Sequence, residues 1–350
     1  MQRRTFIKAT ATMTLGAVGA LSASLPAFGA QELRLLTWEG YADDAWVKNF
    51  EAEYKVQVSK TYVGSNDEYM AKLAAGGADY DLVVIVSSLA RRAIDAGFVE
   101  PLDLSLIPNF ESIFPRAKKV PFIAKDGQIY GAPTFLFVSP VTVNAKELPE
   151  GNDFGVLFDP KNAGKIAMWD DVSTIGDVAN WMGIKDIWNM PDDQLAAVQA
   201  KLIEQKPLVR TYWSQAGEAI ELFTNNEVIA SNSWNYITKN LKERGVPVRE
   251  FLPKPPLGGI DSHFVVKGSR NRELAHHFIN HILSADSQGK EADLYGVTPM
   301  NPASKAHMEP ETWVALGLDD ITREINSMIF WDDIPRRARY MEVLNEVKAA

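Results

Sequence analysis

Aromatic and acidic side chains recur where the predicted strands of this sequence end. The first such place is Trp38-Glu39-Gly40-Tyr41, between an apolar run and a helical pattern. An aromatic face attracts an ammonium group by about 0.5–2 kcal/mol, and a carboxylate adds a charge-assisted hydrogen bond. Together these residue types indicate a site for a cationic amine. A single aromatic is more often a core residue, so the prediction depends on the whole cluster.

The strands that end in these residues alternate with helices, which predicts α/β units with parallel-type sheets. Ligands of such sheets bind outside the carboxyl ends of the strands. The first series predicts strands over 32–38, 55–63 and 80–86, and the second over 165–169, 208–213 and 228–234. The remaining strand ends carry Gly64-Ser65, Ser87-Ser88, Trp169-Asp170-Asp171, the segment from Arg210 to Ser214, Ser233-Trp234 and, on a returning segment, Asp261-Ser262.

Helix signals separate these strands. Ser65 and Glu68 have the spacing of a capping box, and Pro191-Asp192-Asp193 is typical of a helix start. The predicted helices cover 43–54, 66–76, 89–96, 175–182, 217–223 and 236–244, with a longer helix opened by Pro191-Asp192-Asp193 and a helical tail over 271–283, 285–295 and 334–348.

Two extended segments, 130–144 and 255–269, connect the two series. Two crossings predict a discontinuous first domain. We expect lobe 1 to comprise residues 31–135 and 252–350, and lobe 2 to comprise residues 136–251.

The N-terminus is predicted to be an export signal. Residues 1–30 have a basic start with Arg3, Arg4 and Lys8, then a mildly apolar stretch and small residues. The arginine pair resembles the twin-arginine type, and a Sec signal is the alternative. Cleavage is expected near Gly29 or Ala30, which places the mature protein in the periplasm.

Composition excludes several classes of function. Cleavage would remove three basic residues and no acid, which lowers the formal charge from −9 to −12 and argues against a nucleic-acid partner. The absence of cysteine excludes disulfides, cysteine-bound metals and thiol catalysis. No nucleophile elbow, P-loop or dinucleotide-binding motif occurs. His277 and His281 have the spacing of a metal pair but no intervening Glu, so neither a metal nor a cofactor is expected.

A series of segments in this sequence resembles the periplasmic polyamine-binding proteins of bacterial ABC importers, in the same order and at similar spacing over essentially the whole mature chain. The segments are "TWEGYADDAWVKNFEAEYKVQV", "SNDEYMAKLAAGGADYDLVV", "GFVEPLDLSLIPNF", "YGAPTF", "WDD", "SWN" and "GGIDSHFVV". The resemblance implies a type II periplasmic binding protein fold, with two α/β lobes joined by crossover strands that act as a hinge. It also implies a ligand held in the cleft, a membrane permease as partner, and no catalysis. We expect a monomer.

By position, the resemblance implies aromatic walls at Trp38, Tyr41 and Trp234, and carboxylates for amines at Asp171 and Asp261. Three positions depart from the family: Ser88 and Val297 replace tyrosines, and Thr174 replaces a second acid. Combined with the strand ends, the predicted ligand-binding residues are Trp38, Glu39, Tyr41, Ser88, Asp171, Arg210, Ser214, Trp234 and Asp261.

The position of Arg210 leaves the class of ligand undecided. Arg210 could pair with a nearby acid, or it could face the cleft and bind a carboxylate. In the second case the ligand would be an ω-amino acid such as γ-aminobutyrate instead of putrescine or spermidine. Two more distant alternatives are an exported enzyme and a ferric-ion binder, but the latter needs clustered Tyr and His at the cleft.

Overall fold

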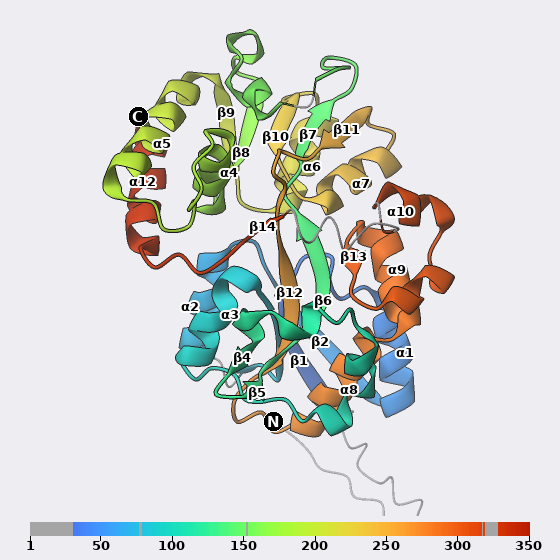
Figure 1. Cartoon of the computed structure of the whole chain (residues 1–350). Coiled ribbons are helices and arrows are strands. Elements are labelled where there is room, and N and C mark those ends of the chain that lie inside the picture. The colour runs from blue at the N-terminus through green and yellow to red at the C-terminus, as the bar shows by residue number, and fades with distance from the viewer. Residues whose placement is uncertain (1–30, 77–78, 152, 317, 319–327) are drawn as a thin grey trace, which may run out of the picture. The chain divides into compact units, whose positions relative to one another are not determined.

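The computed structural model describes residues 31–76, 79–151, 153–316, 318 and 328–350. Residues Gln31–Ala350 form one compact unit, shown in Figure 1. The predicted export signal lies outside the described residues. No described helix is both long and apolar enough to cross a membrane.

The first sheet has seven strands, in the order β13-β6-β12-β3-β1-β2, with β14 paired to β12. Strands β1, β2 and β3 are parallel, whereas β12 runs antiparallel to both β3 and β6. The sheet is therefore mixed, and the prediction of a parallel-type sheet is wrong for its returning half. Its strands are β1 (Gln31–Trp38), β2 (Val56–Val63), β3 (Leu82–Val86), β6 (Gly131–Val138), β12 (Leu257–Val265), β13 (Thr298–Pro299) and β14 (Ile329–Phe330).

The second sheet has five strands, in the order β11-β7-β10-β8-β9. It is also mixed, because β10, β8 and β9 are parallel while β7 is antiparallel to β10 and β11. A separate hairpin pairs β4 (Ala124–Lys125) with β5 (Gln128–Ile129). The strands of the second sheet are β7 (Val141–Asn144), β8 (Ile166–Trp169), β9 (Val209–Trp213), β10 (Ala230–Asn232) and β11 (Val248–Phe251).

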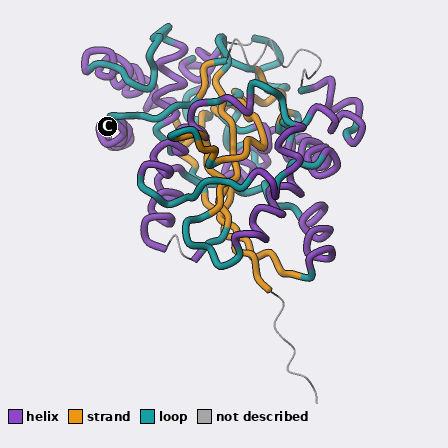
Figure 2. Tube along the Cα trace, turned by 60° about the horizontal axis from the view of Figure 1, so that its bottom comes forward, coloured by secondary structure: helices purple, strands orange, loops and turns teal. Residues whose placement is uncertain are grey.

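Helices lie outside both groups of strands, as Figure 2 shows with helices in purple and strands in orange. Those after strands of the first sheet are α1 (Asp44–Tyr54), α2 (Asn66–Gly76) and α3 (Ser87–Asp95), joined later by α8 (Arg272–Ile282), α9 (Ala285–Tyr295) and α10 (Pro310–Ala315). The second sheet is accompanied by α4 (Ser173–Trp181), α5 (Asp192–Gln205), α6 (Ala216–Thr224) and α7 (Asn235–Glu243). We call the first group with its sheet lobe 1, and the second group with its sheet lobe 2.

Local sequence explains how these elements begin. The Ser65 hydroxyl accepts a hydrogen bond from Glu68 N at 3.2 Å, as the capping-box spacing predicts. The Glu68 carboxylate reaches back to Gly64 N at 3.0 Å, one residue further than expected. Strand β3 is buried along its whole length, which accounts for its continuous β-branched run.

The chain passes between the lobes at both predicted crossings, from β6 to β7 and from β11 to β12. A third crossing was not predicted: after β14 the chain enters α12 (Arg337–Ala349), which packs against α5 of lobe 2. Figure 1 shows α12 in red beside α5. The Tyr340 hydroxyl accepts from Met190 N at 3.0 Å and donates to Ile187 O at 3.0 Å. The assignment of all of 252–350 to lobe 1 is therefore wrong for its last helix.

Candidate functional site

A small cavity lies where the carboxyl ends of lobe 1 strands meet lobe 2. Its volume is about 70 Å³. Residues from both lobes and from the crossings line it: Trp38, Glu39, Tyr41, Asn66, Val86, Phe137, Val138, Trp169, Trp234, Asn235, Tyr236, Asp261, Val297 and Trp331. Five of the nine predicted ligand-binding residues are among them, namely Trp38, Glu39, Tyr41, Trp234 and Asp261.

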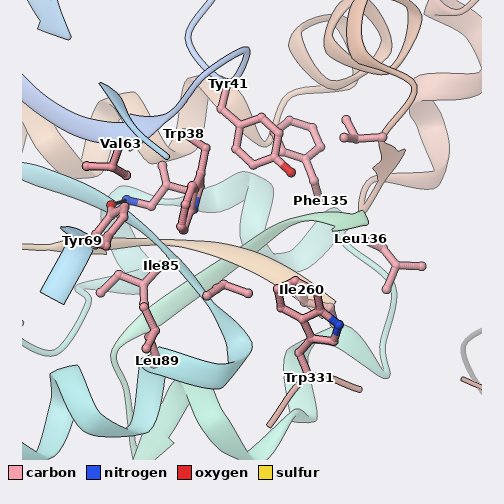
Figure 3. Packing of buried hydrophobic residues seen from close by; sticks show 14 of the residues in the cluster. Trp38, Tyr41, Val63, Tyr69, Ile85, Leu89, Phe135, Leu136, Ile260 and Trp331 are labelled. Carbon is pink, nitrogen blue, oxygen red and sulfur yellow. Dashed lines mark hydrogen bonds between the residues drawn. The ribbon is translucent and has the colours of Figure 1, made fainter. Parts of the chain in front are cut away.

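The lobe 1 wall is built around the end of β1. Trp38 packs on Tyr69 with ring centroids 5.2 Å apart, and Tyr41 packs on Phe135 at 5.5 Å. Figure 3 shows these side chains together with Trp331. Tyr69 is itself fixed, because its hydroxyl donates to Leu36 O and accepts from Val84 N, both at 2.7 Å. The aromatic wall is therefore held by packing and by the adjacent strands.

Asp261 carries the acidic group of this wall. It lies on β12 opposite Val86 of β3, and the Tyr41 hydroxyl donates to its Oδ2 at 2.7 Å. Burial raises the pKa of Asp261 to about 7, although the Tyr41 hydrogen bond opposes the shift. Burial also raises the pKa of Tyr41 well above its usual value, so Tyr41 remains a donor. A cation placed beside Asp261 would favour its charged form.

The lobe 2 wall is a cluster of tryptophans. Trp169 stacks on Trp213 and Trp331 with centroids 5.7 Å apart in both pairs, and meets Trp234 edge-on at 5.0 Å. Trp331 also meets Phe137 of the first crossing edge-on at 4.9 Å. Aromatic rings therefore line the cavity from both lobes and from the crossings.

Charge in the cavity wall is of one sign. Glu39 and Asp261 line it, and no Lys, Arg or His occurs among its described lining residues. Aromatic faces combined with carboxylates suit a cationic group and leave an anionic group without a counter-charge.

Four predicted residues lie outside the lining, namely Ser88, Asp171, Arg210 and Ser214. The Asp171 side chain is fully buried and contacts Asn66 of lobe 1. Ser88 lies in the first turn of α3, where its hydroxyl is buried without a partner. Ser214 lies next to Gly64, since a Cβ at Gly64 would come within 2.6 Å of Ser214 O. Asp171 and Ser214 thus belong to contacts between the lobes.

Arg210 does not line the cavity. Its guanidinium pairs with Glu227 of lobe 2, with Nε donating to Oε2 at 3.1 Å, and its side chain is 47% exposed. Arg210 is the second residue of β9, three residues before Trp213, the buried residue that ends the strand. The alternative, a structural cation paired with a nearby acid, describes its position.

Sequence reasoning missed much of the cavity wall. The rule that ligands bind outside the carboxyl ends of strands pointed to Trp169 and to the region of Asn66, but gave no reason to choose these residues as ligand-binding ones. Phe137 lies near the end of β6 and Trp331 directly after β14, where the chain leaves lobe 1, and neither position was selected from the sequence. The remaining missed residues are Val86, Val138, Asn235, Tyr236 and Val297.

The histidine pair has structural partners. His277 stacks on Tyr54 with centroids 5.3 Å apart, and His281 Nε2 lies 3.1 Å from Trp46 O. No group of three or more possible metal ligands occurs in the parts of the chain that the structure describes.

Two α/β lobes with chain crossings between them, and a cavity lined by both lobes, correspond to the fold of type II periplasmic binding proteins. The chain belongs to the bacterial extracellular solute-binding proteins, whose family model matches residues 45–317.

Known relatives agree with this family. The putrescine/cadaverine-binding protein of Pseudomonas aeruginosa is 25% identical, over 87% of this chain and 89% of its own length. A solved structure of the spermidine/putrescine ABC transporter substrate-binding protein PotD from Streptococcus pneumoniae aligns with a TM-score of 0.76 at 20% identity, over 91% of this chain and 99% of its own. The structure of the Atu4243-GABA receptor aligns with a TM-score of 0.68 at 22% identity, over 91% of this chain and 96% of its own. At these identities, the two structures show the fold alone.

Proposed function

We propose that this protein is the periplasmic substrate-binding component of an ABC importer, and that it binds a small cationic amine of the polyamine class, such as putrescine or spermidine, and delivers it to the permease. The observation that carries the proposal is the cavity wall, in which aromatic rings surround the carboxylates of Asp261 and Glu39 without a lining cation. Its relatives are named as putrescine-, cadaverine- or spermidine-binding proteins, which supports the same class of ligand.

An ω-amino acid is the weaker candidate. The GABA receptor among the structural neighbours favours it. Its carboxylate, however, would need a cation, and Arg210 is engaged with Glu227 on the surface of lobe 2. A carboxylate buried without a counter-charge is costly, so the acidic cavity favours an amine.

Calorimetric titration of putrescine, spermidine and γ-aminobutyrate tests the proposal. We expect binding of at least one of the two polyamines and weak or no binding of γ-aminobutyrate. Tight binding of γ-aminobutyrate alone would overturn the polyamine assignment.

We propose further that residues 1–30 direct export by the twin-arginine route, and that the mature protein acts as a monomer without catalysis of its own. The paired Arg3 and Arg4 support the export route. Changing both to Lys should leave the precursor in the cytoplasm, detected by immunoblotting of cell fractions. Normal processing of this double variant would instead indicate the Sec route.

A further inference from the structure

Asp171 is closed to a ligand, although its position in the sequence predicts a ligand carboxylate. Its Oδ1 accepts from Ser173 N at 2.9 Å and from Ser173 Oγ at 2.8 Å. Asn66 of lobe 1 donates to it through its backbone N at 3.4 Å and through Nδ2 at 3.2–3.3 Å. Asn66 lines the cavity while Asp171 does not. The Asn66 amide therefore stands between the cavity and the carboxylate.

Arg337 supplies a cation to this carboxylate from within the protein. It is the first residue of α12, after the third crossing, and its side chain is only 9% exposed. Its Nε donates to Asp67 Oδ1 at 2.8 Å, and its NH2 group lies 3.9 Å from Asp171 Oδ2. Asp67 is 46% exposed and so is screened by water, whereas Asp171 is fully buried. The guanidinium is thus mostly buried where it approaches Asp171, and its NH2 group makes no hydrogen bond within the described residues.

The unpartnered atoms of the cavity wall give a second, independent observation. Among the residues that the structure describes, the buried indole N–H groups of Trp38, Trp169 and Trp331 have no hydrogen-bond acceptor, and buried Asn66 Oδ1 has no donor. Donors therefore outnumber acceptors among these atoms. An ammonium group offers only N–H donors, whereas a hydroxyl or amide group can both donate and accept. A neutral polar group suits this part of the wall better than a second ammonium group.

We propose that the site selects a ligand with one cationic amine and a neutral, hydrogen-bonding far end, such as an amino alcohol or an N-acylated diamine. Asp261 and Glu39 receive the amine. The guanidinium of Arg337 is the cation beside Asp171, in the place that a second ammonium of the ligand would take. Arg337 therefore acts as a specificity-determining residue. This inference rests on the proposed function, the binding of a cationic amine, and moves the preferred ligand from a diamine to a monoamine with a neutral far end.

Three ligands of the same chain length test the inference: putrescine, 4-amino-1-butanol and γ-aminobutyrate, titrated by calorimetry. The amino alcohol replaces one ammonium of putrescine with a hydroxyl and changes little else. We expect the wild type to bind the amino alcohol about tenfold or more tightly than putrescine, since a second ammonium would approach the positive charge of Arg337. In Arg337→Met, the ratio of the two dissociation constants should shift toward putrescine by about tenfold or more.

The ratio of the two dissociation constants separates ligand specificity from closure of the lobes. Any effect of the substitution on closure changes the binding of both ligands alike and cancels in the ratio. Arg337→Lys keeps the charge and should keep the preference of the wild type. Arg339→Met is the matched control, since Arg339 lies on the same helix but is 40% exposed and pairs with Glu342; its ratio should equal that of the wild type.

Preferential binding of putrescine by the wild type would overturn this inference and leave the proposed function intact. A ratio unchanged in Arg337→Met would also overturn it. Failure of all three compounds and of spermidine to bind would overturn the proposed function and the inference together.

Discussion

A single buried carboxylate, Asp261, dominates the electrostatics of the cavity. It is nearly inaccessible to solvent, and the Tyr41 hydroxyl donates a hydrogen bond to it. With its pKa raised to about 7, it is partly protonated at neutral pH in the absence of ligand. Binding a cation then requires the carboxyl to lose its proton, which couples affinity to pH.

Asp261→Asn keeps the shape and removes the charge. Loss of a charge-assisted hydrogen bond of about 1.5–3 kcal/mol should weaken the binding of putrescine or the amino alcohol by roughly tenfold to a hundredfold. In the wild type, affinity should rise with pH up to about 7 and then level off, because the ionised form binds the ammonium group. The variant should show no such rise. Calorimetry between pH 5 and 8 measures both effects.

Arg210→Ala is the control for that measurement, since Arg210 lies outside the cavity and pairs with Glu227. Its affinities should equal those of the wild type. An unchanged dissociation constant in Asp261→Asn would remove Asp261 from the site.

Sequence could predict which residues lie near the cleft, but not what each of them contacts. The strand-end rule and the family resemblance predicted Trp38, Tyr41, Trp234 and Asp261, all of which line the cavity. The sequence could not predict that Asn66 covers Asp171 and that Arg337 approaches it, because both partners come from distant parts of the chain.

At the scale of elements, the strand and helix series of both lobes could be predicted from local patterns, whereas the pairing of the strands could not. Strand β12 looks like any buried strand in sequence, and its antiparallel direction follows only from the returning chain. The last helix was assigned to the wrong lobe for a similar reason. Its buried residues Tyr340, Val343, Leu344 and Val347 show that it has an apolar face, but not which partner that face contacts.

The two lobes meet closely at Gly64, which follows β2. A Cβ there would lie 2.1 Å from Gln215 Nε2 and 2.6 Å from Ser214 O, both in lobe 2. The Gln215 side chain could move aside, but the backbone oxygen could not without separating the lobes. Gly64 therefore permits the closed arrangement.

Gly64→Ala should hinder closure without unfolding the protein. We expect weaker ligand binding, and a smaller ligand-induced decrease in the radius of gyration measured by X-ray scattering than in the wild type. Thermal stability without ligand should change little. The control is Gly217→Ala in α6, where a Cβ meets nothing within 4 Å and alanine favours the helix by roughly 0.5–1 kcal/mol. Equal ligand-induced contraction in Gly64→Ala and the wild type would contradict this role.

At the scale of the whole molecule, buried carboxyl groups link stability to pH. Burial raises the pKa of Asp261 and of Asp177 to about 7, and raises that of Glu291 well above its usual value. Unfolded carboxyl groups have pKa values near 4, so the folded protein holds more protons than the unfolded protein between pH 4 and 7. Each such group therefore makes stability fall as pH rises through this window. His263, whose pKa burial lowers to about 3, acts in the opposite direction, but only up to about pH 6.5.

The ligand-free protein should accordingly lose stability as pH rises from about 6 to 7, by at most about 1.4 kcal/mol per pH unit for each carboxyl group. Urea denaturation followed by tryptophan fluorescence measures the change. Asp177 lies outside the cavity, and Asp177→Asn removes one of these carboxyl groups. The stability of this variant should therefore depend less on pH than that of the wild type. Bound cationic ligand should act against the loss, because it stabilises ionised Asp261, and its stabilising effect should be larger at pH 8 than at pH 5. A ligand-free denaturation midpoint that stays constant or rises from pH 6 to 7 would contradict the raised pKa values of these carboxyl groups.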